Sequence, residues 1–84
     1  MKVVIYGKPA CVFCTRAKDL VKAKGIDHEY VDFIETGMGR EGLEEIVGGP
    51  VTTVPQIFVD NVHIGGYTDL VSHLVKSDES EVKV

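Results

Sequence analysis

Apolar residues in the first third of the chain follow first a strand pattern and then a helix pattern. The stretch 2–6 is apolar on both alternating faces, which is typical of a strand buried on both sides. After a loop at 7–10, apolar residues recur at helical spacing: Phe13, Ala17, Leu20 and Val21. Gly25 suits the position just past the end of this helix. The stretch 28–33 predicts a second strand, so 2–33 should form a parallel βαβ unit.

The second half of the chain carries shorter patterns. A loop is predicted at 35–40, followed by a short amphipathic helix that the Gly-Gly-Pro sequence at 48–50 ends. Two short strands, 56–59 and 62–64, flank Asp60-Asn61. Asp and Asn tolerate positive φ, so a tight antiparallel hairpin is favoured there.

Gly65-Gly66 interrupts the hairpin pattern before a last helix, whose inner face carries Leu70, Val71, Leu74 and Val75. We therefore predict one domain over 1–76 with a polar C-terminal tail at 77–84. The element order β-α-β-α-β-β-α predicts an α/β fold, a four-stranded mixed β-sheet flanked by three α-helices. Ligand chemistry in such folds gathers at the carboxyl ends of the parallel strands.

Composition narrows the function classes. The 84 residues include nine Lys and Arg against thirteen Asp and Glu, a net charge of −4. This balance argues against nucleic-acid binding, which depends on a basic face. No apolar run approaches the roughly 20 residues that a membrane helix needs. The apolar stretch at the start of the chain is too short for a signal peptide and lacks a small-residue cleavage site. We expect a cytoplasmic protein without a membrane partner.

Cys11 and Cys14 are the two cysteines of the chain, in the stretch GKPACVFCTRAK at 7–18. In a reducing compartment such a close pair is expected to be catalytic or metal-binding rather than a structural disulfide. A zinc site needs four ligands, and His28, His63 and His73 are scattered singly, so no metal is expected. A Cys-x-x-Cys motif beside a βαβ pattern favours redox chemistry.

The two cysteines should differ in reactivity. Cys11 stands where the helix begins, and unpaired backbone N–H groups and the helix dipole stabilise a thiolate there. Lys8 in the preceding loop could add a nearby cation. Cys14 lies almost one turn into the helix, so we expect it to be more buried and to titrate higher. This asymmetry suits a two-step exchange, in which one thiolate attacks a disulfide and the second thiol resolves the mixed disulfide.

Three segments now carry a resemblance to a known family: YGKPACVFCTRAK at 6–18, TVPQIFVD at 53–60 and HIGGYTDL at 63–70. Over about residues 2–75 the chain resembles a dithiol glutaredoxin of the short phage and bacterial type. The resemblance implies a thioredoxin-like fold, with Cys11 as nucleophile and Cys14 as the resolving thiol. It also implies a cis peptide bond before Pro55.

The resemblance further implies a glutathione groove. Val54 would offer its backbone to the cysteinyl part, Lys8 would contact the glycyl carboxylate, and the start of the last helix would hold the γ-glutamyl end. The implied glutathione-binding residues are Lys8, Phe13, Thr53, Val54, Pro55, Gly66, Tyr67, Thr68 and Asp69. Two departures stand out: Val12-Phe13 replaces the usual Pro-Tyr or Pro-Phe, and Tyr67 stands where many relatives have a small residue. For Arg40, in the loop 37–42, we expect a surface role, with a contact to the ligand as the alternative.

As function, the resemblance implies a glutathione-dependent oxidoreductase that reduces protein disulfides and glutathione mixed disulfides. Its implied partners are glutathione and disulfide-containing or glutathionylated proteins, with ribonucleotide reductase as a client, and we expect a monomer. Two alternatives stay open. One is a glutaredoxin-like electron donor reloaded by thioredoxin reductase. The other is an iron–sulfur cluster carrier that uses Cys11 and glutathione, although a Cys11–Cys14 disulfide would compete with the cluster.

Overall fold

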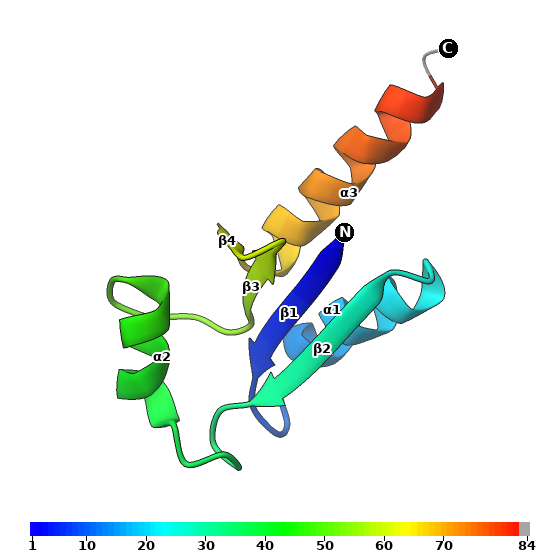
Figure 1. Ribbon diagram of the computed structural model, residues 1–84. Helices are drawn as coiled ribbons and strands as arrows, with labels where there is room; N and C mark the ends of the chain where they lie inside the picture. The colour runs from blue at the N-terminus through cyan, green and yellow to red at the C-terminus, as the bar shows by residue number, and fades with distance from the viewer. Residues whose placement is uncertain (83–84) are drawn as a thin grey trace.

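The computed structural model describes the backbone of residues 1–82 and the side chains of residues 1–75. The elements follow the predicted order β-α-β-α-β-β-α (Figure 1): β1 (Lys2–Gly7), α1 (Val12–Ala23), β2 (Asp27–Asp32), α2 (Gly39–Val47), β3 (Gln56–Val59), β4 (Val62–Gly65) and α3 (Tyr67–Val82). Helix α3 continues beyond residue 76, where a polar tail was expected to begin. Residues 77–82 thus have helical backbone, and 83–84 lie outside the described residues. The domain boundary at residue 76 stays a prediction.

The four strands form one mixed sheet in the order β2-β1-β3-β4. Strands β1 and β2 are parallel, as the βαβ pattern predicted, and place Ile5 beside Tyr30. Strand β3 runs antiparallel to β1 and places Ile57 on the other side of Ile5. Strand β4 completes the sheet antiparallel to β3, so the predicted fold class is confirmed.

The main hydrophobic core lies between the sheet and the two helices α1 and α3. Its buried residues are Val3, Ile5, Ala17, Val21, Ile57, Val59, Leu70 and Leu74. A smaller cluster of Phe33, Leu43 and Val51 lies under α2, which stands apart from the other two helices at the end of β1 and β2 (Figure 1). The chain therefore leaves β1 into a region bordered by α1 on one side and by α2 on the other.

The hairpin between β3 and β4 forms at Asp60 and Asn61, with φ of 50° and 69°. Both values lie in the left-handed region that Asp and Asn tolerate, so this prediction is confirmed. The Asp60 N–H donates to the Lys2 carbonyl at 2.8 Å, and the Lys2 N–H donates to Asp60 Oδ1 at 2.8 Å. These two bonds tie the turn to the first residue of β1.

The loop expected at 35–40 is shorter than predicted, because α2 already begins at Gly39. Its N-cap, Met38, makes no side-chain capping hydrogen bond. Instead the Gly39 N–H donates to the carbonyl of Phe33 at 2.8 Å. Because a backbone contact holds the start of α2, no capping residue marks it in the sequence.

Within residues 1–82, no helix has the combined length and apolar character that crossing a membrane requires.

Candidate active site

Cys11 is the N-cap of α1 and lies at the end of the loop that follows β1. Its backbone is extended, with φ of −106° and ψ of 111°, and its side chain turns back over the first turn of the helix. The Cys14 N–H donates to Cys11 Sγ at 3.2 Å. The sulfur thus occupies the position that an oxygen takes in a usual N-cap.

The partly exposed Cys11 sulfur faces the segment before β3. The Cys11 thiol lies 3.9 Å from the carbonyl oxygen of Val54, in hydrogen-bonding orientation. The Val54–Pro55 peptide bond is cis, as the family resemblance implied. Residues 43 positions apart in the sequence are thereby brought against the same sulfur.

Cys14 lies in a different environment, since its side chain is 0% exposed. Burial, and after it the neighbouring Cys11, raise the pKa of the Cys14 thiol to about 11, against the opposing effects of the Lys8 backbone and the Tyr30 hydroxyl. Both cysteines are free thiols in this structure. The expectation that Cys14 is the more buried of the two thiols is confirmed.

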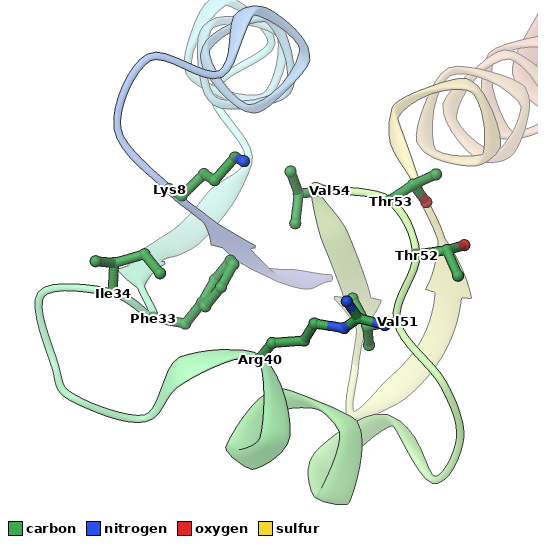
Figure 2. A pocket seen from close by; sticks show the side chains of 8 residues that line it. All are labelled: Lys8, Phe33, Ile34, Arg40, Val51, Thr52, Thr53 and Val54. Carbon is green, nitrogen blue, oxygen red and sulfur yellow. The ribbon is translucent and has the colours of Figure 1, made fainter.

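A first pocket, of about 290 Å³, lies on one side of Val54. Figure 2 shows Lys8 reaching into it from the loop after β1 and Arg40 from the start of α2. Apolar and hydroxyl side chains complete it: Phe33, Ile34, Val51, Thr52, Thr53 and Val54. The surface role expected for Arg40 was therefore incomplete, because its side chain, although exposed, lines this cationic pocket. It also pairs with Glu44, Nε to Oε2 at 3.5 Å.

A second pocket, of about 260 Å³, lies on the other side of Val54. Its lining brings together eight of the nine residues predicted for the groove: Phe13, Thr53, Val54, Pro55, Gly66, Tyr67, Thr68 and Asp69. The rings of Phe13 and Tyr67 lie 5.9 Å apart and form one wall. The ninth predicted residue, Lys8, lines the first pocket, so the two pockets together contain the whole predicted set.

Asp69 is fixed at the start of α3. Its Oδ2 accepts the N–H of Gly66 at 2.9 Å, which caps the turn that leads from β4 into the helix. Gly65, with φ of 119°, lies so close that a Cβ there would overlap the Asp69 carboxylate. Glycine is thus required at residue 65 both for its backbone conformation and for this contact.

The described side chains were expected to hold no metal ion. Across residues 1–75, His, Cys, Asp and Glu side chains do not gather in groups of three or more that could hold a metal ion. His63 instead contacts Gln56, Nε2 to Oε1 at 2.7 Å.

Comparison with known proteins shows which family the chain belongs to. The family model of the glutaredoxins matches residues 3–64, which is most of the chain. The chain belongs to the glutaredoxin family. It is 47% identical over 74 residues to glutaredoxin 1 of Escherichia coli K12, covering 82% of this chain and 87% of that relative. It is 51% identical over 74 residues to a glutaredoxin of Haemophilus influenzae, covering 82% and 85%.

The fold comparison agrees with the sequence comparison. The reduced glutaredoxin of E. coli superposes with a TM-score of 0.79 at 43% identity, over 90% of this chain and 95% of that one. The protein thus has the thioredoxin-like glutaredoxin fold. As a glutaredoxin it is a glutathione-dependent thiol–disulfide oxidoreductase, and Cys11 and Cys14 fit the Cys-x-x-Cys active site of that class.

Proposed function

We propose that Cys11 is the nucleophile and Cys14 the resolving thiol of this glutaredoxin. The Cys11 thiolate attacks one sulfur of a substrate disulfide, forms a mixed disulfide and expels the other substrate sulfur as a thiolate. Cys14 then loses its proton to solvent and attacks Cys11 Sγ. The remaining substrate sulfur leaves, so the substrate gains two electrons and the protein ends with a Cys11–Cys14 disulfide.

Glutathione reverses this oxidation in two steps. One glutathione thiolate attacks Cys11 Sγ, and Cys14 leaves as a thiolate that takes up a proton. A second glutathione attacks the glutathione sulfur of the mixed disulfide, which releases glutathione disulfide and restores the Cys11 thiolate. The exposure of Cys11 and the full burial of Cys14 support this assignment, because an incoming thiol can reach only the first sulfur.

We also propose that glutathione lies across Val54 with one end in each pocket. The carboxylate of its glycyl end suits the Lys8 and Arg40 side of the first pocket. The γ-glutamyl end carries a carboxylate and an ammonium group, which suit the N–H groups at the start of α3 and the Asp69 carboxylate. The observation that carries the proposal is the position of Cys11 Sγ, 3.9 Å from the Val54 carbonyl between the two pockets.

The clients we propose are disulfide-containing and glutathionylated proteins, with ribonucleotide reductase among them, reduced by a monomeric protein in the cytoplasm. Val12 and Phe13, which lie beside Cys11, are 62% and 50% exposed. Two such apolar side chains next to the reactive sulfur offer a contact surface for a protein substrate.

Reduction of the oxidised protein in two parallel assays tests the glutathione assignment against the thioredoxin-reductase alternative. One assay supplies glutathione, glutathione reductase and NADPH, and the other supplies thioredoxin reductase and NADPH. We expect rapid NADPH consumption in the first assay only. Turnover in the second assay only would contradict the proposed glutathione groove while leaving the cysteine chemistry in place.

A further inference from the structure

The hydroxyl group of Tyr30 lies close to the buried thiol of the active site. Tyr30 belongs to β2 and pairs in register with Ile5, so both side chains point to the face that α1 covers. Gly7 follows Ile5 by two residues and therefore lies on that same face. The Tyr30 side chain extends along the sheet toward Gly7, at the end of β1.

Gly7 shows where the hydroxyl meets the resolving thiol. A Cβ on Gly7 would overlap the Tyr30 hydroxyl oxygen and would stand 2.9 Å from Cys14 Sγ. The hydroxyl and the thiol thus share the space that a side chain at residue 7 would fill. Glycine at this position lets the two groups approach each other over the backbone.

The tyrosine ring is fixed from both sides. It packs against the main core, and Lys18 Nζ lies over it at 5.3 Å from the ring centroid. Lys18 follows Cys14 by four residues, so both project from α1 toward the same ring. These two contacts position the ring and, with it, the hydroxyl group.

The hydroxyl is a proton-bearing group at neutral pH. Burial, together with the neighbouring Cys14, Cys11 and Asp32, raises the pKa of Tyr30 to about 12. A hydroxyl that keeps its proton can donate a hydrogen bond to a thiolate, and such a charge-assisted bond is stronger than one between neutral groups. The interaction acts on Cys14 as well, because the Tyr30 hydroxyl lowers its pKa against the larger effect of burial.

We propose that Tyr30 is a further catalytic residue of the exchange, whose hydroxyl donates a hydrogen bond to Cys14 Sγ whenever that sulfur carries negative charge. It does so when Cys14 attacks the mixed disulfide on Cys11 and again when glutathione displaces Cys14 from the Cys11–Cys14 disulfide. Tyr30 keeps its own proton in both steps, and the Cys14 proton is exchanged with solvent. The inference rests on the proposed resolving role of Cys14.

A single-turnover experiment tests it with Tyr30→Phe, which removes one oxygen and keeps the ring under Lys18. Reduced protein is mixed with glutathione disulfide, quenched with acid and analysed by mass spectrometry. We expect the glutathione adduct to form at an unchanged rate and to convert to the Cys11–Cys14 disulfide about tenfold more slowly, the effect of losing one charge-assisted hydrogen bond. Tyr6→Phe is the matched control, since Tyr6 packs edge-on against Phe58 on the opposite face of the sheet.

A second measurement separates a chemical role from a structural one. In Cys11→Ser protein, the added Tyr30→Phe change should raise the pKa of the remaining Cys14 thiol, read from its thiolate absorbance. Reduction of a glutathione mixed disulfide by Cys14→Ser protein should not change when Tyr30→Phe is added, because Cys14 takes no part in it.

Conversion of the adduct at the unaltered rate in Tyr30→Phe protein would overturn the inference, as would equal slowing in Tyr6→Phe protein or slowing of the reaction that omits Cys14. Failure of the unaltered protein to form any glutathione adduct would instead refute the proposed function.

Discussion

The two sulfurs of the active site lie within one turn of α1 but in contrasting regions of the molecule. Cys11 is partly exposed at the helix N-cap, where its sulfur accepts the Cys14 N–H and faces the Val54 carbonyl. Cys14 is fully buried between the helix and the end of β1, and burial raises its pKa to about 11. Substrates can therefore reach Cys11, whereas Cys14, three residues later, can be reached only by Cys11.

The largest effect is expected from removing the exposed sulfur. Cys11→Ser should abolish both protein-disulfide reduction and glutathione-mixed-disulfide reduction, by roughly 10³-fold or more, because no other thiol can form the first covalent bond. Serine is a good N-cap residue, so the fold should be retained. NADPH-coupled turnover measures the loss, and a circular dichroism spectrum checks the fold. Substantial activity in this variant would mean that Cys14 can act as a nucleophile.

Removing the buried sulfur should affect the two reactions differently. Cys14→Ser should keep its rate with a glutathione mixed disulfide, since glutathione itself can release the adduct from Cys11. Reduction of a protein disulfide should fall sharply, because the mixed disulfide with the protein is no longer resolved from within. Parallel assays with the two substrates measure the ratio. Equal loss in both assays would contradict the assigned roles.

A smaller effect is expected from filling the space over Gly7. Gly7→Ala places a methyl group against the Tyr30 hydroxyl and Cys14 Sγ. We expect the free energy of unfolding to fall by about 1–3 kcal/mol, as is usual for overpacking, measured by urea denaturation of the reduced protein. Gly49→Ala is the control, since a Cβ there meets nothing within 4 Å. An equal change in both variants would show that the effect comes from the loss of glycine and not from crowding at the buried sulfur.

Alkaline pH should lower the stability of the folded protein. The pKa of Cys14 rises from 9.0 to about 11 and that of Tyr30 from 10.0 to about 12, in both cases first because of burial. The folded protein therefore binds more protons than the unfolded chain in this range, so the stabilisation is complete below about pH 9. It should be lost progressively as the pH rises toward about 12. Urea denaturation of the reduced protein at a series of pH values measures this.

Comparison with Cys14→Ser sharpens that test. The variant lacks the buried thiol, so its stability should decline less between about pH 9 and 11 than that of the unaltered protein. Identical curves for the two proteins would mean that Cys14 does not titrate higher in the folded state.

Much of the fold could be predicted from the sequence because its determinants are local. The hairpin at Asp60-Asn61 and the strand–helix–strand pattern around Cys11 depend on neighbouring residues. The start of α2 at Gly39 could not be predicted in this way, since a backbone bond to Phe33 holds it and no capping residue marks it. Local pattern therefore set the order of the elements, and a backbone contact from outside the helix set the start of α2.

The candidate site, too, could be predicted from the sequence only in part. The family motifs marked Cys11, Cys14 and the residues that line the pocket at the start of α3. Arg40 was expected mainly at the surface and Tyr30 was not singled out, because nothing near them in the sequence connects them with the cysteines. Arg40 reaches the first pocket through the packing of α2, and Tyr30 reaches Cys14 through the register of β2 with β1.

The measurement that tests the division of roles most directly is to locate the glutathione adduct. Cys11→Ser and Cys14→Ser proteins are treated separately with glutathione disulfide near neutral pH, quenched with acid after a short reaction and mapped by mass spectrometry of their peptides. We predict rapid, complete modification of Cys11 in Cys14→Ser protein and very little modification of Cys14 in Cys11→Ser protein. Comparable rates of modification at the two sulfurs would contradict the account, because the buried sulfur would then be as open to glutathione as the exposed one.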